Sequence, residues 1–430
     1  MKFSSSKTWL DQIATQYSNS EMILLESQMN EHPSSSRSFA AITPKRWIRA
    51  QSDMITMFDG EEIHTFIENP WEALKTFRNQ RNCWLFGYFG YDLKNFTEKL
   101  SSANKLLYKL PDLFFMEPES LLIYKNGEVE KFGKPVLDVV STTELPAGEV
   151  KVEGTVQRLI NKKEYIETVR LIKERIKAGD FYELNYSYPI QAEWHQPAYG
   201  LYQKMREINP VPFGAFLQIA EGAVISISPE RFLKKKGQQI ISEPIKGTAG
   251  RSDDKRVDEK RKSELLNEKN RAENLMIVDL VRHDLSKVSK TGSVRVEKLF
   301  DIQTFGTVHQ LISTIVAEAD KQTDVVDIIK ECFPMGSMTG APKIEVMQAI
   351  EDYESYKRGI YSGAIGYFTP DDDFDFNVVI RTSIVQNNKV IYPVGGAITS
   401  DSEPDEEWNE TKIKAENLTK VFLKDAVITK

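Results

Sequence analysis

A lysine in an unusual setting is the first residue of this sequence that could carry chemistry. Lys246 stands in the stretch SEPIKGTAGR at 242–251, between an isoleucine and a glycine and shortly after a proline. A lysine in a turn is usually a solvated charge, because burying an ammonium group is costly unless it is paired or loses its proton. The alternative is that Lys246 works as a base or a nucleophile, which requires a neighbour that handles its proton.

A hairpin predicts such a neighbour for Lys246. The segment SPERFLKKKGQQIISEPIKG reads as two strands, and a three-residue loop at 237–239 would pair Lys236 with Ile240. Counting outward from that pair places Glu230 opposite Lys246, at a Cβ separation of about 4.5–5.5 Å. A carboxyl group facing an amine suits proton transfer. The alternative is a surface ion pair between strands, and a loop changed by one residue would place the two side chains on opposite faces.

Two predicted helices could bring carboxylates to one place. Asn270 and Glu273 are three residues apart on one helix, so both project from the same face. Glu407 and Glu410 repeat this spacing on another helix. Hard oxygen donors that converge from two helices suit Mg²⁺, which keeps several waters and takes one or two protein carboxylates. The alternative for both pairs is an ordinary solvated helix face.

Three further segments could hold a carboxylated ligand. The loop FPMGSMTGAPK at 333–343 lacks the GxxxxGK[ST] spacing of a phosphate-binding loop, but it leaves backbone amides before a helix. The segment VGGAI at 394–398 has two glycines just beyond a strand. Arg381 lies in the apolar strand VVIRTSI, where a ligand carboxylate would pair its guanidinium. His309, in GTVHQLIS, is interpreted first as a buried core histidine, and the alternative is that it acts as an acid or base.

Composition and charge describe an ordinary globular protein. The 430 residues are 40% hydrophobic and 28% charged, with a formal net charge of -7. That charge argues against a nucleic-acid partner, because phosphate binding needs a concentrated basic face. No apolar run is long enough to span a bilayer. The N-terminal MKFSSSKTWLDQ reaches an acidic residue before an apolar signal core can form, so we expect a cytoplasmic protein.

Helices and hairpins alternate along two expected regions, 1–145 and 155–425. Helices are predicted from Asn161 to Gly179, over about 255–281 and over about 404–424. Strand-like segments lie between them, and Asn126-Gly127 marks one of several hairpins. This pattern favours antiparallel sheets with covering helices over a parallel Rossmann sheet.

Many ordered motifs resemble those of the chorismate-utilising enzymes, and the resemblance runs through most of the chain. The motifs are LLES at 24–27, GYFGYD at 87–92, GDFYELNYS at 179–187, ISPERFL at 227–233, PIKGTAGR at 244–251, NRAENLMIVDLVRHDL at 270–285, TVHQLIS at 307–313, GSMTGAPK at 336–343, YSGAIGYF at 361–368, IRTS at 380–383 and DSEPDEEWNETKIKA at 401–415. The resemblance implies an α+β fold of two stacked, largely antiparallel β-sheets flanked by helices, as in component I of the anthranilate synthases. Within the family, SEPIKGT resembles the aminodeoxychorismate synthases, in which a lysine stands where anthranilate synthases have alanine.

The resemblance implies a covalent mechanism. Lys246 would attack C2 of chorismate as the C4 hydroxyl leaves, and ammonia would then open the adduct at C4 to give 4-amino-4-deoxychorismate for p-aminobenzoate and folate synthesis. Glu230 matches the general acid and base of the family, and His309 matches a histidine near the C4 side of the ring. No cluster resembling a glutaminase is visible, so a separate glutamine amidotransferase subunit is expected to supply the ammonia.

The resemblance also assigns binding residues. Glu273 and Glu410 match direct Mg²⁺ ligands that hold the ion against the ring carboxylate, and Glu407 matches a ligand acting through water. Residues expected to hold the two substrate carboxylates are Thr339, Tyr361, Arg381, Gly395, Gly396 and Lys414. In relatives the LLES motif contributes to a tryptophan pocket in the N-terminal region, for which Glu26 and Ser27 are the candidates here.

Three positions depart from the family pattern. Asn270 replaces an acidic residue, and Ala397 stands where a third glycine is common. Glu183 occupies a position that is glutamine in many relatives and a water-activating lysine in isochorismate and salicylate synthases, so addition of water at C2 is not expected. Two rival interpretations remain, namely component I of an anthranilate synthase and a non-catalytic chorismate-binding or scaffold subunit. Lys246 argues against the first, and the full set of acidic and basic residues argues against the second.

Overall fold

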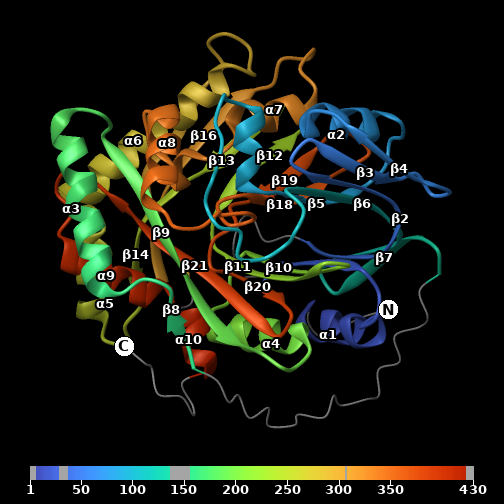
Figure 1. The fold of residues 1–430 in the computed structure, drawn as a ribbon, viewed down its shortest axis with the longest axis horizontal. Coiled ribbons are helices and arrows are strands. Elements are labelled where there is room, and N and C mark those ends of the chain that lie inside the picture. Colours follow the sequence, from blue (N-terminus) through green and yellow to red (C-terminus); the bar gives the residue numbers. More distant parts are fainter. Residues whose placement is uncertain (1–5, 29–36, 136–154, 306–307, 423–430) are drawn as a thin grey trace.

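The computed structural model describes residues 6–28, 37–135, 155–305 and 308–422. Within these ranges, 21 strands form one hydrogen-bonded sheet that folds over on itself (Figure 1). The long strands β2 (Ser38–Gln51) and β6 (Leu113–Lys125) pair along their whole length and belong to both layers. A register irregularity between Pro44 and Arg46 lies where they pass from one layer to the other.

The first layer continues from β2 through β1. Its remaining strands, in spatial order, are β1 (Met22–Glu26), β10 (Phe213–Ile219), β11 (Gly222–Ser228), β20 (Thr382–Gln386), β21 (Lys389–Ile398) and β9 (Glu183–Glu193), with β8 (Gln157–Arg158) and β17 (Gly340–Ala341) beyond β9 and β7 (Glu128–Gly133) beside β6. These pairings are antiparallel, as the hairpin pattern predicts.

The second layer continues from β6 through β5. Its remaining strands are β5 (Leu85–Phe89), β18 (Ala364–Phe368), β19 (Phe374–Asn377), β12 (Arg231–Lys236), β13 (Gln239–Glu243) and β16 (Val308–Glu318), with β14 (Ile245–Gly250) and β15 (Arg295–Thr304) on β16, and β3 (Met54–Phe58) and β4 (Ile63–Ile67) beyond β2. One hydrophobic core lies between the two layers, because it joins residues of β5 and β18 to residues of β10, β11 and β21.

Helices cover the outer faces of both layers (Figure 1). The helices are α1 (Ser6–Gln16), α2 (Pro70–Asn79), α3 (Lys162–Ala178), α4 (Ala198–Ile208), α5 (Lys255–Glu264), α6 (Glu268–Ser286), α7 (Val325–Cys332), α8 (Lys343–Tyr353), α9 (Pro404–Lys414) and α10 (Glu416–Phe422), with short 3₁₀ turns at Tyr91–Phe96 and Gly336–Met338. Residues of α1, α3, α4 and α10 form a core against the first layer, and residues of α2, α6 and α7 form another against the second. The predicted α+β class with stacked antiparallel layers and flanking helices is therefore confirmed.

The predicted first helix and the predicted turn have the expected local chemistry. Asn161 caps α3 and forms a reciprocal capping box with Glu164, and Gly179 ends the helix in the left-handed conformation. Asn126 and Gly127 both have positive φ and join β6 to β7 as a two-residue hairpin turn.

Two predicted helices are wrong in extent, because each contains a break. The segment predicted over 255–281 forms α5 and α6, since the Asn267 side chain accepts a hydrogen bond from the Asn270 amide and starts a new helix. The segment predicted over 404–424 forms α9 and α10, which are separated at Ala415. Helical spacing alone does not reveal such breaks, because the apolar residues keep their period across them.

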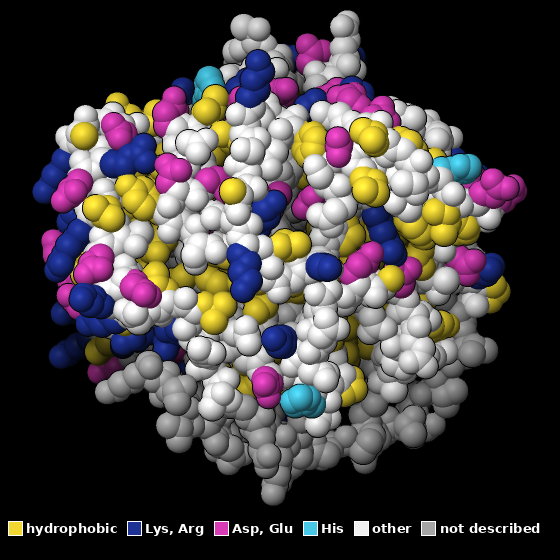
Figure 2. All heavy atoms as spheres, in the orientation of Figure 1, with side chains coloured by type: hydrophobic (Ala, Val, Ile, Leu, Met, Phe, Trp, Pro, Cys, Tyr) yellow, Lys and Arg dark blue, Asp and Glu magenta, His cyan; other side chains and the backbone are white. Residues whose placement is uncertain are grey.

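The proposed division between 1–145 and 155–425 stays a prediction, and residues 136–154 of that connection lie outside the described residues. Charged side chains of both signs are interspersed over the face in Figure 2, with several Lys and Arg side chains at the edge formed by α3, α5 and α9. Within the described residues, no helix combines the length and apolar character needed to cross a bilayer.

Candidate active site

The candidate catalytic residues gather where the two layers meet helices α6 and α9. Glu183 begins β9 and pairs with Ala341 of the short strand β17. Lys246 lies in β14, and α6 contacts both β14 and β16. Helix α9 packs on β21, whose residues pair along β9. Four segments far apart in the sequence thus converge on one region.

Lys246 forms a buried ion pair. Its side chain donates a hydrogen bond of 2.7 Å from Nζ to Oε1 of Glu183, and the two residues are only 9% and 0% exposed. Burial by itself would lower the pKa of Lys246, but the carboxylates of Glu183 and Glu273 outweigh burial and raise that pKa. Lys246 therefore holds its proton as an ammonium ion when no ligand is present.

The predicted cross-strand pairing of Lys246 with Glu230 is wrong. The loop between β12 and β13 has two residues, of which Gly237 has a φ of 59°, so Lys236 pairs with Gln239 instead of Ile240. A one-residue change of loop length shifts every pair in the hairpin. Lys246 also lies beyond the hairpin, in β14, which pairs with β16.

Glu230 nevertheless lies near Lys246 in the tertiary structure. Burial raises the pKa of Glu230 to about 7, and the hydrogen bond from Ser337 and the positive charge of Lys246 partly oppose that rise. The Ser337 hydroxyl donates to Glu230 Oε1 at 2.8 Å. A carboxyl group with this pKa can both donate and accept a proton near neutral pH.

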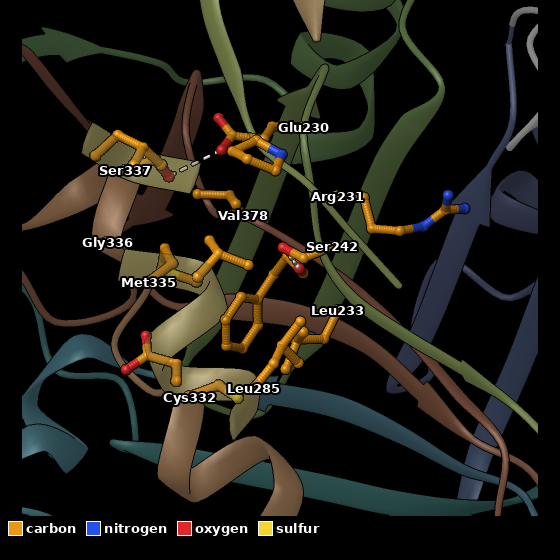
Figure 3. Close-up of a pocket in the computed structure, with 15 residues that line it drawn as sticks. Glu230, Arg231, Leu233, Ser242, Leu285, Cys332, Met335, Gly336, Ser337 and Val378 are labelled. Carbon is orange, nitrogen blue, oxygen red and sulfur yellow. Dashed lines mark hydrogen bonds between the residues drawn. The ribbon is translucent and has the colours of Figure 1, made fainter. Parts of the chain in front are cut away.

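A small, mainly apolar cavity lies beside Glu230 (Figure 3). The carboxyl group of Glu230 and its bond to Ser337 lie at one end, and Leu285 and Cys332 lie at the other. The side chain of Arg231 points away and pairs with Asp375, as alternation along a strand requires. The cavity lining includes Glu230 but not Lys246. It thus adjoins the candidate site through Glu230 and explains why that carboxyl is poorly solvated.

The acidic residues of α6 and α9 face each other across a lysine. Lys269 Nζ lies 3.4 Å from Glu407 Oε1 and 4.0 Å from Glu273 Oε1. Burial raises the pKa of Glu273 and also that of Glu407, and the neighbouring Glu410 raises the latter further. The pKa of Glu410 is lowered instead, because Lys414 lies 2.6 Å from it. The two helices therefore concentrate negative charge at one place, as the sequence predicts.

This donor set fits a divalent cation of the Mg²⁺ kind only in part. Burial is the first cause of the raised pKa values of Glu273 and Glu407, and a bound cation would oppose that rise by favouring their charged forms. Among the described residues, however, no three acidic, histidine or cysteine side chains converge closely enough to hold a metal by themselves. Mg²⁺ commonly takes one or two protein carboxylates and completes its coordination with water and substrate oxygens. Glu273, Glu407 and Glu410 could serve in that way.

The two glycines of VGGAI lie beside this acidic region. Gly395 and Gly396 pair with Ser187 and Tyr186 in the β21–β9 ladder. A Cβ atom built on Gly396 would lie 3.5 Å from Glu407 Oε2, 3.6 Å from Lys414 Nζ and 3.9 Å from Glu410 Oε1. Lys414 also donates to the carbonyl of Gly395 at 3.0 Å. Gly396 therefore leaves open the space in front of the α9 carboxylates.

Arg381 is a cation without an ion-pair partner among the carboxylates of the described residues. Burial lowers the pKa of its guanidinium, and the charge of Glu230 partly compensates. Its backbone is held in the left-handed region at a φ of 50°, which is costly for a residue other than glycine. A ligand carboxylate would supply the missing partner.

The other predicted binding residues are buried close by but have local partners. The Thr339 hydroxyl donates to the carbonyl of Met335 at 3.1 Å. Burial raises the pKa of Tyr361, whose ring centre lies 5.8 Å from the guanidinium carbon of Arg358. Neither contact points to a ligand by itself, so their substrate roles stay predictions.

His309 is held by two neighbours. Its Nε2 lies 3.0 Å from Asp258 Oδ1, and its Nδ1 lies 2.9 Å from the Thr304 hydroxyl. The pKa of Asp258 is lowered, first by the backbone N–H of Ser252 and then by Arg251 and His309. Both ring nitrogens therefore have partners, and action at the C4 side of a ligand stays a prediction.

Glu26 and Ser27 line a second cavity, which does not share lining residues with the Lys246 site. Glu26 is buried and bound by Arg206 Nη1 at 3.1 Å and by the Tyr202 hydroxyl at 2.6 Å. Both residues thus line one cavity, and the tryptophan pocket stays a prediction.

Two of the three family departures have local explanations. The Asn270 side chain donates to the Leu265 carbonyl at 3.1 Å and lies beside Gly247, so it braces the β14 loop. Ala397 pairs with Asn185 in the β21–β9 ladder and is accommodated there. The third, Glu183, is the partner of Lys246.

Sequence comparison decides the family. The signature of the chorismate binding enzyme family matches residues 21–420. The chain belongs to this family. Its N-terminal strands and its catalytic-region strands both fall inside the match, in agreement with a resemblance that runs through most of the sequence.

Three known proteins illustrate what this chorismate-binding enzyme is similar to. It is 40% identical over 291 residues to the aminodeoxychorismate synthase of Streptomyces griseus, covering 66% of this chain and 40% of that protein. It is 31% identical over 410 residues to aminodeoxychorismate synthase component 1 of Bacillus subtilis, covering 88% and 87% of the two chains. The crystal structure of anthranilate synthase component I from Streptococcus pneumoniae superposes with a TM-score of 0.77 at 23% identity, covering 90% and 93%. This last likeness shows the shared fold.

Sequence reasoning missed three contacts in the site of this chorismate-binding enzyme. The family pattern marks Glu183 only as a departure, and nothing in the nearby sequence connects it with Lys246, which is 63 positions away. Ser337 lies inside a recognised glycine-rich motif, but its bond to Glu230 spans 107 positions. Lys269 could have been found, because it stands one helical turn before Glu273.

Proposed function

We propose that this chorismate-binding enzyme is component I of an aminodeoxychorismate synthase, which aminates chorismate at C4. The observation that carries the proposal is the buried Lys246, held by Glu183 at 2.7 Å and electrostatically coupled to Glu230, within the SEPIKGT segment. The names of the S. griseus and B. subtilis relatives support the same reaction. A buried lysine that can lose its proton is a nucleophile for an electrophilic carbon.

In the proposed reaction, Lys246 attacks C2 of the ring and Glu230 acts on the hydroxyl group that leaves from C4. The lone pair of neutral Nζ bonds to C2, the two ring double bonds shift, and the C4–O bond breaks. Glu230, with a pKa of about 7, donates its proton to the departing hydroxide, which leaves as water. Ammonia then attacks C4, the double bonds shift back, the C2–N bond breaks, and Glu230 recovers a proton from the new amino group.

We further propose that Glu273, Glu407 and Glu410 hold Mg²⁺ together with water and a substrate carboxylate. When bound, the ion would neutralise that carboxylate and draw electron density from the ring. Arg381 would pair with a second carboxylate, because it lacks an ion-pair partner among the described residues. Gly396 would leave room for the ligand beside α9.

Ammonia is proposed to come from a glutamine amidotransferase partner. The B. subtilis relative is named as component 1, and a numbered component implies another component. The S. griseus relative is longer, since the match spans 40% of its length. For this chain, both the partner and its delivery of ammonia are part of the proposal.

The cavity at Glu26 and Ser27 is proposed to take an amino acid such as tryptophan. Glu26 lines this cavity, and its buried carboxylate is held in place by Arg206 and Tyr202. A tryptophan titration followed by fluorescence would show saturable binding, and E26Q should weaken it. Unchanged binding in E26Q would argue for another anchoring residue.

Component I of an anthranilate synthase is the second candidate, because its fold is the same. Lys246 discriminates between the two reactions, since the alanine-bearing enzymes would not form a covalent lysine adduct. The purified chain with chorismate, Mg²⁺ and an ammonium salt is expected to yield aminodeoxychorismate, detected as p-aminobenzoate after the lyase is added. Anthranilate as the main product would overturn the proposal.

The covalent intermediate has its own test. Incubation with chorismate and Mg²⁺ without ammonia should leave an adduct on Lys246 that mass spectrometry detects. K246A should bind chorismate but lose amination by at least about 10³-fold, because the nucleophile is gone. A fully active K246A protein would contradict covalent catalysis, and turnover by neither protein would favour a non-catalytic subunit.

A further inference from the structure

The Lys246–Glu183 pair has a feature that the reaction proposed above leaves unexplained. A nucleophilic amine must lose a proton, yet the neighbouring carboxylates raise the pKa of Lys246. Both residues are buried, so bulk water is poorly placed to accept that proton. The amine therefore needs a proton acceptor inside the protein.

Glu183 is the carboxylate in contact with the amine. Its Oε1 lies 2.7 Å from Nζ, and within the described residues no other carboxylate forms an ion pair with Lys246. Glu230 influences Lys246 through its charge but is bound by Ser337. Glu273 also raises the pKa of Lys246, but its ion-pair contact is with Lys269.

The second oxygen of Glu183 also points to proton transfer. Among the residues that the structure describes, the buried Glu183 Oε2 has no hydrogen-bond partner, and Glu183 itself is 0% exposed. A buried carboxylate that lacks a donor on one oxygen is less well stabilised in its charged form. Transfer of a proton from Nζ to Glu183 removes two buried charges at once and needs no movement of either chain segment.

We propose that Glu183 is a catalytic base that takes one proton from Lys246 before the attack and holds it until the amine is released. The inference rests on the proposed function. The ion pair becomes a neutral amine and a neutral carboxylic acid, and the amine then bonds to C2 as a secondary ammonium group while Glu230 protonates the departing hydroxide. When ammonia breaks the C2–N bond, Lys246 leaves as a neutral amine and takes its proton back from Glu183.

The pH dependence of adduct formation tests this role without ammonia. In the full-length wild-type chain, the rate of adduct formation with chorismate and Mg²⁺ should show no rise with pH below 7, because the proton moves internally. E183Q keeps the size and the hydrogen-bond acceptor but not the base. At pH 7 it should form the adduct at least about 100-fold more slowly, and its rate should climb about tenfold per pH unit.

The conservative variant and the wild-type profile complete the test. E183D keeps a carboxylate and should recover part of the rate lost in E183Q, with the weaker pH dependence of wild type. An E183Q rate within about threefold of wild type, with the same profile, would overturn the inference. A wild-type rate that climbs tenfold per unit from pH 6 to pH 9 would overturn it without any variant. If the wild-type protein formed no adduct, that result would contradict the proposed function itself, and the proposed role of Glu183 would be contradicted with it.

Discussion

Lys269 and Glu407 join the two acidic helices, with Nζ of the lysine 3.4 Å from Oε1 of the glutamate. The lysine also lies 4.0 Å from Glu273, so one ammonium group stands between two carboxylates proposed to hold Mg²⁺. Two cations cannot share this position without repulsion. The charge of Lys269 is therefore expected to weaken the binding of a metal ion at this site.

Removal of that lysine should tighten metal binding. K269M is expected to lower the apparent Kd for Mg²⁺ by about three- to tenfold, a modest factor because the lysine is partly exposed and its charge is screened. Isothermal titration of the protein with Mg²⁺ measures the change. K260M removes a similar but exposed partner of Glu264 on α5 and serves as the control. Weaker Mg²⁺ binding in K269M than in K260M would contradict the proposed position of the metal.

Alanine substitutions at the adjacent residues Gly395 and Gly396 should have different effects. In G396A the new methyl group would meet Glu407 and Lys414 at ordinary contact distances, so the protein should fold normally. Because the methyl fills the space in front of α9, KM for chorismate should rise about tenfold or more. In G395A the methyl would lie 2.4 Å from the Tyr186 carbonyl oxygen, so that variant should lose thermal stability. Thermal melts and steady-state kinetics separate the two effects, and a G396A protein with unchanged KM would contradict the proposed ligand position.

The ionisation of Glu230 should lower the free energy of unfolding as pH rises. Its pKa is about 7 in the folded chain against 4.5 ordinarily, so between these values the folded chain binds a proton that the unfolded chain has lost. Stability gained from the neutral carboxyl is full below pH 4.5 and is lost as pH rises through 7, up to about 3 kcal/mol. Urea denaturation at pH 5 and pH 8 should show a smaller decrease in E230Q than in wild type. Equal decreases in both proteins would contradict the raised pKa.

Arg381 should matter for binding and little for folding. R381M removes a guanidinium that forms no ion pair with a described carboxylate, so the free energy of unfolding should stay within about 1 kcal/mol of wild type. KM for chorismate should rise about 100-fold, because a substrate carboxylate loses its charged partner. R231M breaks buried pairs with Asp375 and Glu243 and should lose about 3–5 kcal/mol of stability. If R381M destabilises the chain as much as R231M, the role of Arg381 is structural.

Local chemistry made several elements predictable. The capping box of Asn161 with Glu164 and the terminal Gly179 set the bounds of α3 without help from the rest of the chain. The Asn126-Gly127 turn likewise specifies its hairpin. The fold class followed from the resemblance of motifs spread along the chain to those of a known family.

Element breaks and strand register were less predictable, because they depend on small differences in local geometry. The division of 255–281 into α5 and α6 depends on Asn267 acting as an N-cap. The free energy of such a cap is small, so a capped break and a continuous helix differ little in stability. The β12–β13 register depends on whether two or three residues form the loop. The shorter loop changed every predicted pair of this hairpin, and Lys246 lies outside it in β14.

The sequence by itself determined which residue types were present: a lysine in SEPIKGT, carboxylates at helical spacing on two segments, and family motifs in order. Only the tertiary structure decided that Lys246 faces Glu183 and that Lys269 lies between Glu273 and Glu407. The physical reason is that these pairs are brought together by packing of distant segments, and burial then sets their pKa values. Neither the partner of a buried charge nor its solvation is encoded in the residues beside it.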